Sequence, residues 1–548
     1  MQEEIQIKNL DHLGLIAGMI DELGIVECID EQIGKKSDDK LLSYGELVKA
    51  MILNGLGYVN KQLYLVPKFF SDKPLHTLFK RDVKAEWFND DALGRTLDAL
   101  YQYGVSELYQ SISFKAMNIL GLTLKTLHLD STSFHVDGEY NRYSHNSDDN
   151  RVSIKITKGY SRDHHPELNQ VVLNLMVEHQ AGIPVWMKAS NGNQIDTKEF
   201  AIIVKKHIKA MKSDSLKELM LVSDAALFTK ETLKHIAQNN IKFITRVPNK
   251  LKEAKTLLRH CSNGFYAIDD NYKAIETSIE YEGIKQRWIL YKSNLASKRE
   301  EKTVFKKLSK QSLDELNSLQ KLSKKSFFCE EDAKAAFETI KERLKSVQIV
   351  KATLKSIPKY KTRGRKKAGT KPDFYHYTWQ FTYASNIDYF KNLVDQKSGL
   401  FILATNYLDI SAKVLLDEYK SQQRVERGFR FLKSPEFLVD SLYLKKPERI
   451  ESLLMIMTLS LMVYSALEYR IRKELKVNNE TFPNQLKKPI QNPTARWIFE
   501  NFFAIHLLMM NNTYQIIGLN PLHRQILRLL GSSYEAFYGI YDSEMANT

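Results

Sequence analysis

Apolar residues three and four positions apart recur through the first 123 residues, and this spacing is typical of amphipathic helices. The segments SYGELVKAMILNGLGYV and NDDALGRTLDALYQYGV show the spacing most clearly. Asn89 and Asp90 stand where the second helix should begin, and both residue types are good helix caps. We therefore expect residues 1–123 to form a helical N-terminal region.

From Leu122 the pattern changes to alternating apolar and polar residues, which is typical of β-strands. The first strand is predicted in TLKTLHLDSTSFHVDGEY, which contains Asp130. Turn residues separate three further stretches that predict the rest of an antiparallel meander: VSIKITKG, QVVLNLMVEHQ and IPVWMKAS. Asp130 is then expected in the middle or at the end of the first strand.

A helix is expected over residues 195–211, and the chain then changes to a mixed pattern. The stretch LKELMLVSDAALFTKETLKHIAQNNIKFITRVP predicts strand, turn, helix and strand in that order. Asp224 follows the apolar LMLV run directly. Alone, an acidic residue after a strand is most simply a turn residue.

Residues 249–398 change character again and are interpreted as an insertion. IETSIEYEGIKQRWILYKS predicts a β-hairpin around Glu282 and Gly283. Two charged stretches, EEKTVFKKLSKQSLDELNSLQKL and CEEDAKAAFETIKERLKS, predict a pair of helices, and HYTWQFTYASN returns to strand alternation. The segment KYKTRGRKKAGTKPD carries seven Lys or Arg between Lys359 and Lys371 and no acidic residue among them.

Near the C-terminal end, DISAKVLLDEYKSQQRVERGFRFLK predicts one helix of about six turns. Asp409 is a good N-cap, and no Gly or Pro interrupts the next eighteen residues. An apolar stripe of Val425, Phe429 and Leu432 should anchor this helix to a core. Beside that stripe, within about 80° of one another, lie the side chains of Tyr419, Gln422, Glu426, Arg430 and Lys433.

The most apolar window is Leu453–Leu467, fifteen residues bracketed by Glu451 and Glu468. It is shorter than the roughly 20 residues that cross a bilayer, so we predict a buried core helix and no membrane span. Residues 476–548 are predicted to form a helical C-terminal region.

Charge and cysteine content indicate the partner and the compartment. The chain has 80 basic and 65 acidic residues, a net charge of +15, which favours a polyanionic partner such as nucleic acid. A ribosome-associated or membrane-surface protein fits this balance as well. Three isolated cysteines without a CxxC pair argue against a disulfide framework or a zinc ribbon, and the first residues lack a secretory signal pattern. We therefore expect a cytoplasmic location.

The spacing of Tyr419, Glu426 and Lys433 resembles the Y-(2)-R-(3)-E-(6)-K signature of bacterial insertion-sequence transposases of the DDE type. Gln422 stands at the Arg position of that signature, and Arg424 lies on the far side of the predicted helix. The stretches RFLKS, LKKPERIESLL and GYSRDHHPELNQ also resemble this family. The resemblance covers residues 85 to 470 approximately.

The resemblance implies an α+β multidomain fold with a ribonuclease H-like catalytic core. The first part of that core would be residues 124–248 and the second part residues 399–475, with 249–398 as a β-rich and helical insertion between them. In such a core two parallel strands and a later helix supply three carboxylates. Asp130, Asp224 and Glu426 stand at those positions in the chain.

Three carboxylates without His or Cys ligands suit hard divalent cations. We expect two Mg²⁺ ions, with Mn²⁺ as a substitute, and both catalytic and metal-binding roles for the three carboxylates. Two such ions would activate a water and stabilise the leaving 3′ oxygen during in-line attack on phosphorus.

Several residues are predicted to contact DNA. The resemblance implies that Tyr419 and Lys433 hold phosphates, with Gln422 at the Arg position, and helical phase adds Arg430. Arg363, Gly364 and Arg365 resemble a minor-groove hook, although phosphate contact without readout and a solvated loop are alternatives. The basic residues that we single out in this segment are Arg363, Arg365, Lys366 and Lys367.

Two further predictions about DNA have strong alternatives. Trp288, in the insertion hairpin, is a candidate for stacking on a base turned out of a bent duplex, but a strand Trp is more often core and Trp379 is a rival. Residues 1–123 either recognise the ends of the element or form a purely architectural bundle.

The function implied is cut-and-paste transposition: binding of terminal inverted repeats, metal-dependent strand cleavage, and strand transfer to target double-stranded DNA. A homodimer in the synaptic complex and a bacterial, nucleoid-associated location are expected. The alternatives are a ribonuclease H-like nuclease that cuts without joining, and a catalytically silent, domesticated DNA-binding protein. Gln422, in place of the Arg of the signature, favours the catalytically silent protein, whereas the three intact carboxylates argue against it.

Overall fold

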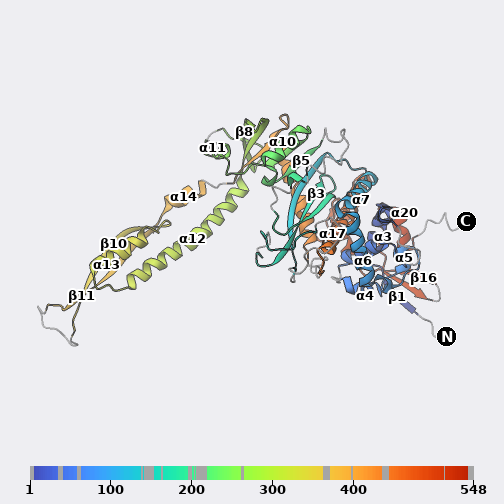
Figure 1. Cartoon of the computed structure of the whole chain (residues 1–548), viewed down its shortest axis with the longest axis horizontal. Helices are drawn as coiled ribbons and strands as arrows, with labels where there is room; N and C mark the ends of the chain where they lie inside the picture. Colours follow the sequence, from blue (N-terminus) through green and yellow to red (C-terminus); the bar gives the residue numbers. More distant parts are fainter. Residues whose placement is uncertain are drawn as a thin grey trace. The chain divides into compact units, whose positions relative to one another are not determined.

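The computed structural model describes fourteen parts of the chain: residues 5–34, 41–58, 63–136, 140, 153–161, 165–194, 200–202, 204, 219–260, 264–361, 371–395, 399–434, 444–510 and 513–540 (Figure 1). They fall into two compact units. The main unit comprises Met1–Arg246, Glu280–Lys285 and Thr405–Thr548, and the inserted unit comprises Val247–Ile279 and Gln286–Ala404.

The main unit contains five neighbouring strands of a mixed sheet. The first three pair antiparallel along the chain, and the last two run parallel to the first of them. Nearly every residue of these strands is buried, as expected where both faces of a sheet are covered. In spatial order the strands are β4 (Pro184–Ser190), β3 (Asn169–Glu178), β2 (Thr126–Val136), β5 (Met220–Ser223) and β6 (Lys242–Arg246).

The predicted meander is present in β2, β3 and β4, but the prediction of a strand at VSIKITKG is wrong for its described part. Residues 153–159 make a single bridge, from Thr157 to Gln170. A neighbouring loop satisfies this backbone instead of a strand: Asn191 accepts from the Lys155 N–H, and the Gly192 N–H donates to the Lys155 carbonyl. A Cβ at Gly192 would lie 2.0 Å from the Gln170 carbonyl oxygen, so glycine permits this close approach.

The core of the main unit surrounds the long helix α17 (Pro447–Val477). It contacts four helices of the N-terminal region, α1 (Leu13–Glu22), α3 (Tyr44–Leu56), α6 (Asp90–Tyr103) and α7 (Val105–Leu120) (Figure 1). The buried core helix predicted from the apolar window is confirmed. Length and composition alone would let α17 cross a membrane, but 89% of its most apolar window is buried against the rest of the chain.

Polar contacts fix the N-terminal helices to this core and to the sheet. Arg449 of α17 pairs with Asp98 of α6, with 2.7 Å between Nη2 and Oδ2. Tyr109 and Ser113 of α7 donate to backbone carbonyls of β4 at 2.7 Å each. The predicted N-cap Asn89 is confirmed, since its side chain accepts from the Ala92 N–H.

A second sheet joins the two ends of the chain and corrects the expectation of wholly helical terminal regions. Strand β1 (Ile5–Asn9) pairs antiparallel with β15 (His506–Met510), which pairs with β16 (Thr513–Ile517). The C-terminal helices are α18 (Ala495–Asn501), α19 (Pro521–Leu530) and α20 (Ser532–Phe537). Five-residue strands are stable only when paired, and here the pairing partner lies about 500 positions away in the sequence, beyond any local pattern.

A hairpin that the sequence predicts correctly follows helix α11 (Lys252–His260) and strand β7 (Tyr266–Ala267) in the chain. Strands β8 (Tyr272–Tyr281) and β9 (Ile284–Ser293) meet at Glu282 and Gly283, whose φ angles are 53° and 77°. Two consecutive positive φ angles are the geometry of the tight hairpin turns that match strand twist. Among the strands of the inserted unit the spatial order is β12 (Leu400–Thr405), β9, β8 and β7.

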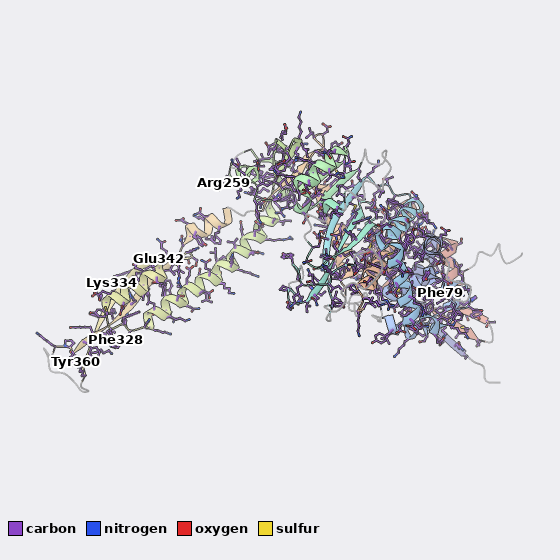
Figure 2. The ribbon with its side chains drawn as sticks, viewed as in Figure 1. Phe79, Arg259, Phe328, Lys334, Glu342 and Tyr360 are labelled. Carbon is purple, nitrogen blue, oxygen red and sulfur yellow. The ribbon has the colours of Figure 1, made fainter. Side chains whose placement is uncertain are left out.

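The rest of the inserted unit is an elongated arm. Helix α12 (Asn294–Lys324) runs beside the hairpin of β10 (Val347–Lys359) and β11 (Phe374–Ser385), and α13 (Glu330–Lys341) packs on β11 (Figure 1). The predicted helix pair and returning strand are therefore present. Figure 2 shows Phe328 and Tyr360 near one end of this arm. A small apolar core holds it together, formed by Leu322, Phe327, Ala333, Phe337 and Trp379.

Glu451 provides a test of the packing around α17. Burial raises the pKa of this carboxyl to about 7, because its charged form loses water. The positive charge of Lys188 lowers the pKa, and the negative charges of Glu107 and Glu448 raise it. The folded state thus binds more protons than the unfolded state between pH 4.5 and 7, so stability should fall as the pH rises through this window. Glu451→Gln should raise the free energy of unfolding at pH 8 by on the order of 1–2 kcal/mol and leave it nearly unchanged at pH 4.

Urea unfolding at the two pH values measures this difference. Glu86→Gln, at an exposed glutamate, is the matched control and should change stability little at either pH. Equal effects of Glu451→Gln at pH 4 and pH 8 would contradict the assignment.

Candidate active site

The geometry of the candidate site starts with the pairing of β2 and β5. These strands are parallel, and Leu129 lies opposite Ser223. The Ser223 hydroxyl donates to the Leu129 carbonyl at 2.9 Å in a buried position. Asp130 and Asp224 are the next residues along the two strands, and paired strands lie about 4.8 Å apart. The register therefore sets the two aspartates side by side.

Local hydrogen bonds orient both aspartates. Oδ1 of Asp130 accepts from the Ser131 N–H at 2.8 Å. Oδ1 of Asp224 accepts from the Ala226 N–H at 2.9 Å and caps the short 3-10 helix Ala225–Leu227. The Thr245 hydroxyl donates to the backbone carbonyl of Asp224 at 2.6 Å. Both side chains remain partly exposed, so a ligand can reach them.

The helix that carries the glutamate is broken, which corrects the prediction of one continuous helix. The structure has α15 (Ala412–Lys420) and α16 (Gln423–Leu432), and the N-cap is Ser411 instead of Asp409. Ser411 accepts from the Val414 N–H, since it directly precedes the first helical residue. At the break, the Ser421 hydroxyl donates to the Asp417 carbonyl at 3.0 Å, and serine bonding of this kind bends helices.

Each half of the broken helix packs on a different pair of strands. Helix α15 contacts β5 and β6, whereas α16 contacts β2, β3 and α17. The predicted apolar stripe on α16 is confirmed, since Val425, Phe429 and Leu432 are all buried. Gly428 also packs closely, because a Cβ there would lie 3.1 Å from Leu461 of α17.

The polar residues of this region separate into exposed and buried positions. Glu426 and Arg430 are exposed on α16. Lys433 follows the last turn, and its Nζ lies 5.8 Å from the ring centre of Phe134 on β2. Gln422 is buried at the start of α16, with 8% exposure. The structure thus separates Gln422 from the exposed face that the single-helix prediction assigned to it.

The pKa of the Tyr419 phenol responds to the charges of the three carboxylates. Burial raises the pKa of its phenol above the ordinary value, Arg246 opposes the rise, and the charges of Asp224, Asp130 and Glu426 add to it. All three carboxylates thus act electrostatically on this one phenol, which places them in the same region of the main unit. The phenol stays protonated at neutral pH and can donate a hydrogen bond.

Arg246 belongs to the same site and was not singled out from the sequence. Strands β5 and β6 are parallel with Ser223 opposite Thr245, so Arg246 follows at the position next to Asp224. Asp130 within β2, Asp224 just after β5 and Arg246 at the end of β6 therefore lie at neighbouring positions across three strands. The signal in the sequence is a cation directly after the apolar KFIT strand, and its charge offsets part of the carboxylate repulsion.

The other predicted DNA contacts lie elsewhere. Arg363, Arg365, Lys366 and Lys367 lie outside the described residues. Trp288 is fully buried, and its Nε1 donates to Gln286 at 2.9 Å. Trp379 is buried too and donates to the Ala333 carbonyl. A buried indole reaches a base only if its strand opens, so both tryptophans occupy core positions.

The donor set fits divalent cations. Two aspartates from neighbouring strands and one glutamate from a helix offer oxygen ligands only, which is the preference of Mg²⁺ and Mn²⁺. The arrangement of two strand carboxylates and a later helical one defines the class of DDE enzymes.

The comparisons identify the family within that class. Residues 123–463 match the family model of the transposase DDE domain, and residues 5–114 match a domain of unknown function, DUF4277. The first match covers more than half of the chain, so the chain belongs to the transposase DDE domain family and is a DDE-type DNA transposase.

Other comparisons add little. No curated protein matches this chain. Among solved structures, a cryo-EM structure of the piggyBac transposase synaptic complex with hairpin DNA matches at 9% identity and a TM-score of 0.38. That match covers 91% of this chain and 81% of the other, and at this TM-score it carries no argument.

The carboxylates should make the stability of the protein depend on metal. Mn²⁺ at a concentration of about 100 times its Kd should stabilise the wild type by about 2.7 kcal/mol, because it binds only the folded chain. Asp130→Asn, Asp224→Asn and Glu426→Gln should each remove most of this gain, as measured by thermal unfolding with and without Mn²⁺. Asp409→Asn, at an exposed aspartate just before α15, should retain it. If any one of the three variants keeps the full stabilisation by Mn²⁺, the substituted residue does not belong to the site.

Proposed function

We propose that this chain binds the ends of an insertion sequence and moves the element by cut-and-paste, through metal-dependent strand cleavage followed by strand transfer. The observation that carries the proposal is the parallel register that sets Asp130 beside Asp224, with the Glu426 helix packed on β2 and β3. The order of elements supports a ribonuclease H-like core: an antiparallel meander, then the parallel strands β5 and β6 joined by α10 (Lys230–Gln238), and later the glutamate helix.

The roles of the side chains follow from their charges and positions. Asp130, Asp224 and Glu426 would hold two Mg²⁺ ions, or Mn²⁺ as a substitute. When bound, the ions supply an activated water and stabilise the leaving 3′ oxygen. Tyr419, protonated at neutral pH, donates to a phosphate oxygen, and Arg246 neutralises phosphate charge beside Asp224.

The helix α16 contributes the remaining contacts. Arg430 is exposed one turn beyond Glu426, and Lys433 lies beside β2, so both cations approach the DNA backbone near the cut. Gln422, at the Arg position of the family signature, is buried, which supports a role in joining α15 to α16 over a direct DNA contact. A neutral amide is cheaper to bury there than a guanidinium.

The net charge of +15 supports double-stranded DNA as the partner, with terminal inverted repeats and target DNA as substrates. We further propose a homodimer in the synaptic complex, DNA contacts from residues 1–123 and from the basic segment 359–371, and a nucleoid-associated location in a bacterial cytoplasm.

Strand cleavage tests the proposal. The substrate is a duplex that carries the inverted repeat found beside the gene, assayed with Mg²⁺ by gel electrophoresis. Asp130→Asn, Asp224→Asn or Glu426→Gln should each lower the cleavage rate more than about 100-fold, because each removes a metal ligand. DNA binding should stay within about twofold of wild type, since basic surfaces supply it.

Three outcomes distinguish the alternatives. Cleavage followed by joining to a target plasmid supports transposition, and cleavage without joining points to a nuclease. Binding of the repeat without metal-dependent cleavage points to a silent DNA-binding protein. Asp409→Asn should behave as wild type throughout.

The basic segment has its own test. Neutralising Arg363, Arg365, Lys366 and Lys367 to Gln should flatten the slope of log K against log salt by about 0.9 for each phosphate that the protein no longer neutralises. Filter binding over a range of NaCl concentrations measures the slope. The matched control removes the same charge from exposed lysines of α12 and should change the slope less; these are Lys302, Lys306, Lys307 and Lys310. An unchanged slope in the segment variant contradicts a role in DNA binding, and weaker binding confined to A·T-rich DNA indicates groove reading.

A further inference from the structure

A group of side chains with metal-ligating atoms lies in the main unit and contains none of the three carboxylates. His128 is on β2, His179 directly follows β3, and Glu418 is on α15. Among the described residues, one ligand atom from each of the three lies within 4.8 Å of the other two. His128 stands two residues before Asp130 on the same strand and therefore on the same face of it.

The distances between the three side chains fit a shared metal ion. Nε2 of His128 lies 3.1 Å from Nδ1 of His179, and Nδ1 of His179 lies 3.4 Å from Oε2 of Glu418. Ligand bonds of about 2.0–2.2 Å in a tetrahedral zinc site place neighbouring ligand atoms roughly 3.3–3.6 Å apart. His128 is fully buried, whereas the side chains of His179 and Glu418 are 27% and 22% exposed, which leaves a route for an ion.

Hydrogen bonding alone does not satisfy this group. A neutral imidazole has one N–H and one lone pair, and Nδ1 of His179 faces both neighbours. If it carries the proton, it can donate to only one of them. If it accepts from His128, its lone pair faces the Glu418 carboxylate. Within the described part of the chain, Oε2 of Glu418, which faces His179, is buried without a hydrogen-bond partner.

A cation at the centre removes this conflict, because it takes one lone pair from each of the three side chains. Two further charged groups lie close by: the Arg424 guanidinium interacts with both Glu178 and Glu418. Arg427 and Arg472 act on Arg424 in turn, so carboxyl and guanidinium charges are mixed around the three side chains.

We propose that His128, His179 and Glu418 form a second metal site, for a borderline divalent metal such as Zn²⁺. Two imidazoles and one carboxylate are a donor set that zinc prefers, with a fourth position open to water. The all-oxygen set of Asp130, Asp224 and Glu426 suits Mg²⁺ instead. The two sites therefore differ in the metals that they select.

The site would position the catalytic region. It connects β2, the end of β3 and helix α15, and Tyr419 directly follows Glu418 in the chain. A bound ion would hold α15 against the strand that carries Asp130, and with it the phenol beside the three carboxylates. All three proposed ligands come from this chain, so Zn²⁺ binding can be tested without DNA. The result does not depend on the proposed transposition activity.

The test measures Zn²⁺ binding to the full-length chain by isothermal titration calorimetry. The carboxylate site is removed by the double change Asp130→Asn and Asp224→Asn, and millimolar Mg²⁺ is present throughout. We expect about one Zn²⁺ per chain. Adding His179→Gln or Glu418→Gln should weaken binding at least about tenfold, the effect expected when even an outer-shell partner is removed.

The matched control is His76→Gln, because His76 and Asp82 form a similar pair on the surface, with 3.1 Å between Nδ1 and Oδ1. It should not change the Zn²⁺ affinity. Absence of Zn²⁺ binding, or binding unchanged in both His179→Gln and Glu418→Gln, overturns the proposal.

A second measurement needs none of these variants. X-ray absorption at the zinc edge, on the wild-type chain with one equivalent of Zn²⁺ and excess Mg²⁺, reports the ligand atoms directly. A shell with two imidazole nitrogens supports the site, and a shell of oxygens only overturns it. This measurement tests the proposal even if a variant fails to fold, because it uses the wild-type chain.

Discussion

The parallel pairing of β2 with β5 is the constraint on which the candidate site depends. Leu129 lies opposite Ser223, and the serine hydroxyl bonds the facing carbonyl, so the register is fixed one residue before the two aspartates. A slip of one residue would turn a side chain to the opposite face of the sheet. The same register, carried on to β6, sets Arg246 beside Asp224.

The third carboxylate depends on packing at a distance from the chemistry. Val425, Phe429 and Leu432 bury the opposite side of α16, and burial of each such side chain is worth roughly 1.5–3 kcal/mol. This energy holds a short helix that exposes Glu426 and Arg430. Helix α17 lies behind α16 and also contacts α1, α3, α6 and α7, so the helical N-terminal region supports the surface against which the glutamate helix packs.

Much of this could be predicted from the sequence, because periodic patterns and strand ends are local signals. The long apolar helix, the hairpin at Glu282 and Gly283, and both aspartates after strand residues followed from such signals. The pairing of β1 with β15 could not be predicted, since its partners lie at opposite ends of the chain. The break at Ser421 coincides with one bond from its hydroxyl to the Asp417 backbone carbonyl, and the neighbours of Arg246 and His128 are set by tertiary contacts.

The central claim is that Asp130, Asp224 and Glu426 form one divalent-cation site. Anomalous diffraction from crystals of the full chain soaked in Mn²⁺ tests it most directly, because it locates the ion without any assay of activity. The account predicts Mn²⁺ density bounded by these three carboxylates. Ordered crystals with all three side chains visible and no Mn²⁺ among them would contradict it.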